Sequence, residues 1–87
     1  MYTVRILKSA SKELVRLDPS IKRRVVERVN WLVANFGKVQ LIPLKGSLSG
    51  LYKLREGDYR VIYQVIRKDK IILIHAIGHR REIYRKK

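Results

Sequence analysis

The sequence predicts an α+β protein in which an N-terminal helical hairpin packs on one face of a small, mainly antiparallel four-stranded sheet. Three observations support this fold class. A short alternating segment at the N-terminus is typical of a strand, two amphipathic segments follow it, and the C-terminal half contains three apolar runs separated by short polar turns. The expected order is therefore β-α-α-β-β-β. The 87 residues suffice for one core, so we expect a single domain over residues 1–87.

The N-terminal strand is expected over Tyr2–Leu7, where apolar and polar side chains alternate. Ser9 has the side chain of an N-cap for a short helix that ends at Leu17. Asp18 and Pro19 favour the start of a second helix, because proline is well tolerated at the first helical position. A tight turn between the two helices makes them a helical hairpin.

The second helix has the clearest pattern in the chain. Its apolar residues recur at intervals of three and four, which places them on one stripe: Ile21, Val25, Val29, Leu32 and Phe36. Gly37 is the expected stop, since glycine is favoured just after the end of a helix. Residues 38–50 contain several glycines and serines and one proline, and we expect them to form a connector.

Three strands are expected in the C-terminal half, over Leu51–Arg55, Tyr59–Ile66 and Lys70–Ile77. The segments between them are short enough for hairpin turns, so the three strands should form an antiparallel meander. The remaining residues, from Gly78 to Lys87, form a strongly basic tail.

The register of the first hairpin predicts a cationic cluster. A two-residue turn at Glu56-Gly57 would place Lys53 directly opposite Arg60. Because side chains alternate between the faces of a sheet, Arg55 would share their face. Like charges across a strand pair destabilise a sheet unless an anion lies between them, so this pairing indicates an anion site. A three-residue loop would instead oppose Lys53 and Val61 and disperse the cluster.

The second hairpin extends this pattern, with a two-residue turn expected at Lys68-Asp69. The side chains expected to face the helices are Tyr52, Leu54, Tyr59, Val61, Tyr63, Val65, Ile72, Ile74 and Ala76. His75 and Ile77 then fall on the cationic face. We expect His75 to have a structural or partner-contact role.

The net charge indicates a polyanionic partner. The chain has 21 Lys and Arg residues against seven Asp and Glu, which gives +14 at pH 7. A charge this large repels itself within a small fold, and it favours nucleic acid first, an acidic protein second and an anionic membrane surface third. Eleven of the cations are arginines, whose guanidinium groups suit bidentate phosphate contacts.

Several function classes lack the residues that they need. The chain has no cysteine for a thiolate metal site and no apolar run long enough to span a membrane. The N-terminus lacks the pattern of a secretion signal, so we expect a cytoplasmic protein. Carboxylates are scarce and only two histidines are present, so we expect no metal and no cofactor. Metal-free phosphoryl transfer remains, with the 2′-hydroxyl of RNA as the nucleophile.

Three segments resemble the RelE/ParE toxin superfamily, and most closely the RelE-like mRNA interferases. They are Tyr52–Arg55, the Gly57-Asp58-Tyr59-Arg60 hairpin with the strand that follows it, and the ending Gly78–Tyr84. The resemblance spans nearly the whole chain. It implies a toxin of a type II toxin–antitoxin system that enters the ribosomal A site, cleaves the mRNA there, and is neutralised by an acidic RelB-like antitoxin.

The resemblance also implies which residues form the site. It assigns four catalytic positions: Lys53, Arg60, Arg80 and Tyr84. Further candidates for catalysis or RNA binding are Arg55, His79 and Arg81. Tyr84, or Lys53 in its place, would activate the 2′-hydroxyl, while Arg60 and Arg80 hold the phosphate. Arg55 or His79 would assist the leaving oxygen.

Two other functions stay open on the sequence alone. A ParE-like toxin would inhibit gyrase by binding, with the same fold and basic surface but without a need for Tyr84. A non-enzymatic module would bind RNA or DNA with a strong salt dependence and would leave no cleavage products.

Overall fold

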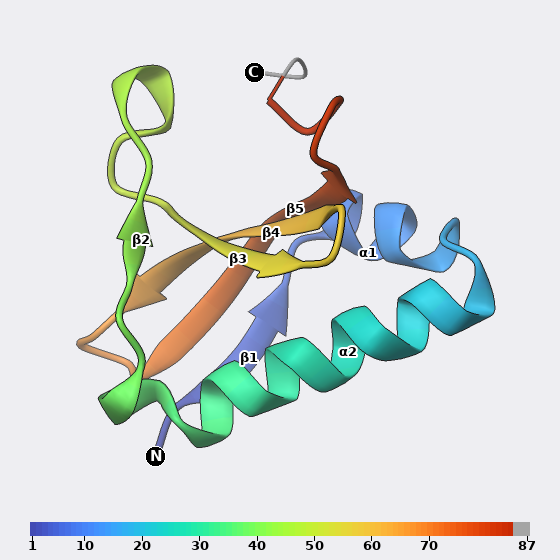
Figure 1. The fold of residues 1–87 in the computed structure, drawn as a ribbon. Coiled ribbons are helices and arrows are strands. Elements are labelled where there is room, and N and C mark those ends of the chain that lie inside the picture. Colours follow the sequence, from blue (N-terminus) through green and yellow to red (C-terminus); the bar gives the residue numbers. More distant parts are fainter. Residues whose placement is uncertain (85–87) are drawn as a thin grey trace.

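The computed structural model describes residues 1–84 and has two layers, with two helices on one face of a sheet (Figure 1). The helices are α1 (Lys8–Val15) and α2 (Pro19–Ala34). The strands are β1 (Thr3–Ile6), β2 (Ile42–Pro43), β3 (Tyr52–Glu56), β4 (Tyr59–Ile66) and β5 (Ile71–His79). Two short 3-10 turns span Phe36–Lys38 and Gly46–Leu48. Positions 85–87 of the expected basic tail lie outside the described residues.

The sheet has five strands in the order β1-β5-β4-β3-β2. β1 runs parallel to β5, and every other neighbouring pair is antiparallel. The predicted α+β class and the mainly antiparallel sheet are confirmed, but the count of four strands is wrong. The connector contributes β2, in which Ile42 pairs with Lys53 and Pro43 with Tyr52. A two-residue edge strand that ends in proline is too short to show an alternating pattern.

The starts of the helices differ in part from the prediction. The N-cap of α1 is Leu7 and not Ser9, and no side chain caps it. Asp18 is the N-cap of α2 and Pro19 its first residue, as predicted, although the Asp18 side chain makes no capping hydrogen bond. The fixed φ of proline and its missing N–H suit the first position of a helix, so α2 begins here without a side-chain capping hydrogen bond.

The end of α2 falls three residues before Gly37. Its last residue is Ala34, and Asn35 follows as the C-cap. Both the backbone N–H and the side-chain Nδ2 of Asn35 donate to the carbonyl of Trp31, at 3.0 and 2.9 Å. Gly37 therefore does not stop the helix, and it lies in the 3-10 turn instead.

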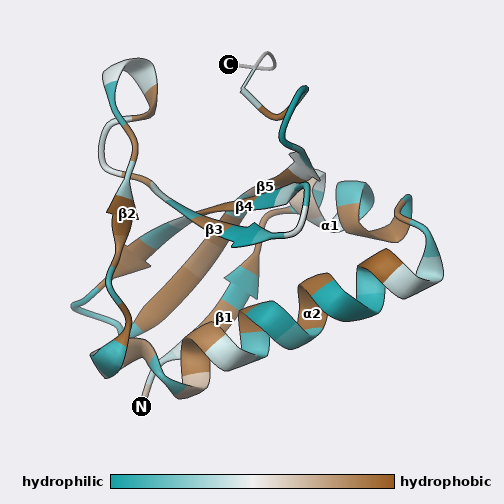
Figure 2. Cartoon of the chain, in the orientation of Figure 1, coloured by the Kyte–Doolittle hydropathy of each residue, from teal (hydrophilic) through white to brown (hydrophobic). Residues whose placement is uncertain are grey.

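The main core lies between the helices and the sheet. Ala10 of α1 and the predicted stripe of α2, with Val25 and Leu32 fully buried, face the sheet. The buried strand residues opposite them are Leu54, Val61, Tyr63, Ile72, Ile74 and Ile77. Figure 2 shows β5 as hydrophobic over most of its length, in keeping with its position inside the sheet.

The first hairpin turns at Gly57-Asp58, one residue later than predicted. Gly57 has a φ of 59°, a left-handed conformation that glycine adopts at no steric cost. Arg55 therefore lies opposite Arg60, and Lys53 lies opposite Ile62, so the predicted Lys53–Arg60 pairing is wrong. Moving the turn by one residue shifts the pairing by two, and each side chain keeps its predicted face.

The second hairpin follows the predicted register until a β-bulge between Ile62 and Tyr63 of β4. The extra residue on β5 is His75, and beyond it the side chains change faces. Ile77 joins the main core and Ala76 turns to the opposite face, which reverses the prediction for both.

The bulge also explains the position of His75. Its Nε2 lies 2.9 Å from Oε1 of Gln64 on the neighbouring strand, within hydrogen-bonding distance. This contact fits the structural role expected for His75. None of the helices in residues 1–84 is long and apolar enough to cross a membrane.

Candidate functional site

Cationic side chains gather on the sheet face opposite to the helices, close to the β3–β4 turn. Arg55 and Arg60 are direct cross-strand partners there. Lys53 lies on the same face, two residues before Arg55, at a distance of about 7 Å along the strand. On its other side Arg60 lies opposite Gly78 of β5, which has no side chain to cover it.

The guanidinium of Arg60 is held by carbonyl groups of its own turn. Its Nη1 donates to the carbonyl of Gly57 at 2.9 Å and to that of Tyr59 at 2.8 Å. These bonds hold the positive charge near two partial negative charges and so offset the repulsion from Arg55. A guanidinium has five N–H donors, so most of those of Arg60 remain for an anion.

The segment after β5 folds back over the same face, and Ile83 anchors it. Ile83 is 2% exposed and forms a second apolar cluster with Ile62 and Ala76. It also lies against Gly78, since a Cβ added there would be 3.6 Å from the Ile83 side chain. The N–H of Ile83 donates to the carbonyl of His79 at 2.9 Å and closes the turn. The tail is therefore packed beside the cations.

Arg80 is fastened to the turn that holds Arg60. Its backbone N–H donates to the carbonyl of Asp58 at 2.8 Å, and its Nε lies 3.6 Å from Oδ1 of the same residue. The side chains of Arg80 and Asp58 are 52% and 65% exposed, so the ion pair contributes little to stability. Its effect is to bring a third guanidinium to the site beside Arg55 and Arg60.

His79 lies on the other side of the sheet from these cations. It is the cross-strand partner of Tyr59, and the two rings meet edge to face at 5.4 Å. Its Nδ1 accepts a hydrogen bond from the backbone N–H of Arg81 at 3.1 Å. His79 thereby stabilises the turn that leads into the tail.

Arg81 and Tyr84 lie on the tail itself. The Arg81 side chain is exposed, and Tyr84 is 39% exposed directly after the buried Ile83. Among the predicted residues, Arg55, Arg60 and Arg80 meet at one turn. Lys53 lies farther along β3, and the tail carries the phenol group.

Three residues that shape this site were not predicted from the sequence. Ile83 anchors the tail, Asp58 orients Arg80, and Nε of Arg28 donates from α2 to the carbonyl of Arg55 at 3.1 Å. The guanidinium of Arg28 also stacks 4.3 Å from the ring centroid of Trp31. Of the three, only Ile83 stands out in the sequence, because it is a lone aliphatic residue within a polar tail and such a residue is typical of a packing contact.

The chemistry of the site follows from these groups. Within residues 1–84, no three His, Cys, Asp or Glu side chains come together as metal ligands do. The site offers guanidinium, ammonium and phenol groups. Such groups bind a phosphate, stabilise negative charge that develops on it, and transfer a proton.

The chain matches known toxins over most of its length. Residues 4–84 match the family described as the ParE toxin of type II toxin-antitoxin system, parDE. Toxin RelG of Mycobacterium tuberculosis is 32% identical over 88 residues, which cover 98% of this chain and 98% of that protein.

Solved structures agree with these sequence matches. A chain in the toxin-antitoxin complex RelBE2 from Mycobacterium tuberculosis is 32% identical with a TM-score of 0.80, over 90% of this chain and 96% of that one. A chain in the archaeal RelE-RelB complex from Pyrococcus horikoshii OT3 is 37% identical with a TM-score of 0.68, over 93% and 97%. The similarity in structure therefore extends over nearly the whole chain.

Proposed function

Since this chain belongs to the RelE/ParE toxin superfamily of type II toxin–antitoxin systems, we propose that it is an mRNA interferase that cleaves mRNA at the ribosome without a metal ion. The observation that carries the proposal is the meeting of Arg55, Arg60 and Arg80 at one turn. Three guanidinium groups beside an anchored tail suit a phosphodiester. The similarity to toxin RelG and to RelE chains favours this function.

The proposed reaction is a phosphoryl transfer within the RNA chain. The 2′-oxygen attacks the adjacent phosphorus as it loses its proton to a base. The bond from phosphorus to the 5′-oxygen breaks, and that oxygen takes up a proton. The products are a 2′,3′-cyclic phosphate and a 5′-hydroxyl, so the reaction needs a base, an acid and cations for the phosphate.

We assign these roles to the residues of the cationic face and the tail. Tyr84 is the base, with Lys53 as the second candidate. Arg60 and Arg80 bind the non-bridging oxygens and stabilise their charge in the transition state. Arg55 donates a hydrogen bond to the leaving oxygen. We prefer it to His79, the other residue expected in this role, because the His79 ring packs on Tyr59 at the helix side of the sheet. Arg81 contacts the RNA backbone beyond the scissile phosphate.

Two partners follow from the proposed function. The substrate is mRNA in the ribosomal A site, and the neutralising partner is an acidic RelB-like antitoxin in the same cytoplasm. The net charge of +14 supports both, because each partner is anionic. Structures of two relatives were solved as a toxin-antitoxin complex and a RelE-RelB complex, which supports an antitoxin for this chain.

Primer extension on mRNA from translation reactions tests the proposal. The wild-type protein should give new 3′ ends within translated codons, whereas Arg80→Ala and Tyr84→Phe should lower cleavage by about 100-fold or more. Both variants should fold and bind the antitoxin as the wild type does, because the two side chains are exposed. Normal cleavage by both variants would overturn the site assignment.

Gyrase inhibition is the second candidate function, because the family that matches residues 4–84 is described as a ParE toxin. A supercoiling assay with purified gyrase separates the two functions. An inhibitor of gyrase would block supercoiling, leave translated mRNA intact, and keep its effect in Tyr84→Phe.

A further inference from the structure

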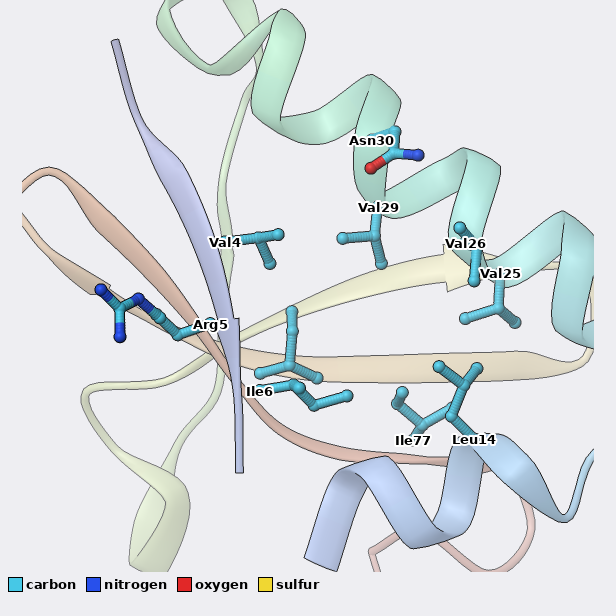
Figure 3. A pocket seen from close by; sticks show the side chains of 10 residues that line it. Val4, Arg5, Ile6, Leu14, Val25, Val26, Val29, Asn30 and Ile77 are labelled. Carbon is cyan, nitrogen blue, oxygen red and sulfur yellow. The ribbon is translucent and has the colours of Figure 1, made fainter. Parts of the chain in front are cut away.

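Hollows of different chemistry border α2 on two sides. One, of about 410 Å³, lies toward β1 and is lined mainly by aliphatic side chains, Val26 and Val29 of α2 among them (Figure 3). The other, of about 300 Å³, lies between α2, the connector before β2, and β3. This second hollow, the Trp31 pocket, has five polar or charged residues in its lining: Arg28, Lys38, Gln40, Lys53 and Arg55. Four cations around so small a space indicate an anionic ligand.

The Trp31 pocket has an apolar floor and an aromatic wall. Leu54 and Tyr63 line it from the main core, where they are 5% and 1% exposed. Trp31 lines it from α2 and is 43% exposed, so part of the indole is open to a ligand. Gln40 offers an amide that can both donate and accept a hydrogen bond. A flat ring with polar edges, such as a nucleobase, matches these surfaces, and the volume suits a ligand of about one nucleotide.

Arg28 holds the indole in place and links it to β3. Its guanidinium carbon lies 4.3 Å from the centroid of the Trp31 ring, in a cation–π contact. Its Nε donates to the carbonyl of Arg55 at 3.1 Å, just beyond the residues of β3 that pair with β2. A ring that is already fixed loses little conformational entropy when a ligand stacks on it. Trp31 is therefore a prepared stacking surface beside β3.

The rim of the pocket is continuous with the cationic face. Lys53 and Arg55 belong to the lining of the pocket, and both also belong to the face on which the phosphate is proposed to bind. No carboxylate lines the pocket within residues 1–84. Glu27 and Glu56 line a neighbouring hollow that shares Trp31. An anionic chain would therefore reach the indole from the Lys53 side.

We propose that a nucleotide next to the scissile phosphate stacks its base on Trp31 while its own phosphate lies against Lys53. The inference rests on the proposed function for the identity of the ligand, and it adds a subsite that selects an unpaired base. Every base has a π-face, so stacking on an aromatic side chain tolerates any sequence. In a duplex each base is stacked between its neighbours, which excludes duplex RNA from this subsite.

An acidic peptide matches the pocket less completely. A carboxylate would meet the charge of Lys38 or Lys53, but it would leave the indole and the apolar floor uncovered. A nucleotide uses both features of the pocket, because its phosphate is anionic and its base presents a flat π-face. RNA is therefore the ligand that this lining favours.

Tryptophan fluorescence tests the subsite directly, because Trp31 is the only tryptophan in the chain. The protein is titrated with single-stranded 2′-O-methyl oligoadenosine, whose blocked 2′-oxygens cannot attack the phosphate. Adenine stacked on the indole should quench the emission, and the quenching should saturate together with the anisotropy of a dye-labelled oligomer. Inorganic polyphosphate carries charge without bases, so it should compete for the protein without quenching its emission.

Substitutions of Trp31 separate stacking from charge. Trp31→Leu keeps an apolar side chain but removes the flat ring, and it should weaken binding of the oligomer about tenfold. The slope of log K against log salt concentration should stay the same, because no charge is lost. Trp31→Phe keeps an aromatic ring and should bind closer to the wild type. Val15→Ala is the matched control, because Val15 is 66% exposed and does not line the pocket.

The outcomes separate this inference from the proposed function. RNA that binds without quenching the emission, or a folded Trp31→Leu that binds as tightly as the wild type, overturns the subsite and leaves mRNA cleavage in place. Equal quenching by polyphosphate, or quenching by the acidic antitoxin and not by RNA, also overturns it and assigns the pocket to charge alone or to the antitoxin. Quenching by RNA in a protein that leaves translated mRNA intact supports the subsite and overturns the proposed function. Should Trp31→Leu fail to fold, the titrations of the wild type still decide.

Discussion

At the scale of single residues, the side chain of Ile83 joins the tail to the sheet. Ile83→Ala removes most of its contact with Ile62 and Ala76, and we expect mRNA cleavage to fall about tenfold or more because Tyr84 loses its fixed position. The free energy of unfolding should fall by less than the roughly 2–5 kcal/mol of a central core deletion, since the tail detaches while the main core stays intact. Primer extension and urea denaturation measure the two effects.

Two comparison variants make this expectation specific. Ile83→Val keeps most of the buried volume and should cleave almost as the wild type does. Ile72→Ala lies in the main core and should destabilise the whole fold. Wild-type cleavage by a folded Ile83→Ala would mean that the reaction does not depend on the anchored tail.

The sequence identifies the charged residues of the candidate site more readily than the residues that position them. Arg60 and Arg80 stand within short motifs, and both side chains are bound to residues of the β3–β4 turn. Asp58 belongs to the same motif as Arg60, but its ion pair with Arg80 depends on where the chain turns after β5. A contact between residues so far apart in sequence leaves no local pattern.

At the scale of elements, β4 carries a titratable group into the core. Burial, reinforced by the neighbouring Tyr52, raises the pKa of Tyr63 from 10.0 to about 12. An unfolded chain releases this proton near pH 10, whereas the folded chain retains it up to about pH 12. The contribution of the Tyr63 proton to the free energy of unfolding is therefore complete below pH 10. It is lost as the pH rises to 12, which lowers the free energy of unfolding by about 2–3 kcal/mol.

Urea denaturation between about pH 9 and pH 12 measures this loss. The difference in unfolding free energy between the wild type and Tyr63→Phe should change across this range in favour of the variant, which has no proton to lose. Tyr84→Phe should follow the wild type, because Tyr84 lies outside the core. Parallel curves for the wild type and Tyr63→Phe would contradict the raised pKa.

Both hairpins show which features of an element a sequence can reveal. The turn at Gly57-Asp58 differs by one residue from the prediction, yet the faces of β3 and β4 are correct because the pairing moved by two. The bulge at His75 shifts the pairing by one residue only. Ala76 and Ile77 therefore lie on the faces opposite to those predicted. A bulge inside a strand is not marked by a turn residue in the sequence. A prediction from the alternating pattern therefore continues unchanged beyond the bulge.

At the scale of the whole molecule, the hydrophobic periodicity was sufficient to predict two layers. The α2 stripe and the three C-terminal strands have strong local patterns, and these pack together. The position of β1 is set by parallel pairing with β5, as in the pair Val4–Ile72, and no local signal specifies that partner. β2 was missed because two residues are too few for a pattern.

The net charge of +14 leads to a prediction about where on the molecule RNA binds. Each phosphate neutralised on a single strand contributes about −0.7 to the slope of log K against log salt concentration. If Lys53, Arg55, Arg60 and Arg80 together neutralise four phosphate charges along the strand, the slope should be about −3, and removing one cation in Arg60→Gln should change it to about −2. Lys68→Gln, on the turn between β4 and β5, should leave the slope unchanged.

Fluorescence anisotropy with a labelled single-stranded RNA measures these slopes, in a Tyr84→Phe background that prevents cleavage. The comparison between Arg60→Gln and Lys68→Gln is decisive, because both remove one positive charge from the same total. If total charge alone attracted the RNA, the two substitutions would flatten the slope equally. An effect confined to Arg60→Gln means that the phosphates contact the cationic face beside the tail, and that the rest of the charge acts at longer range on the rate of association.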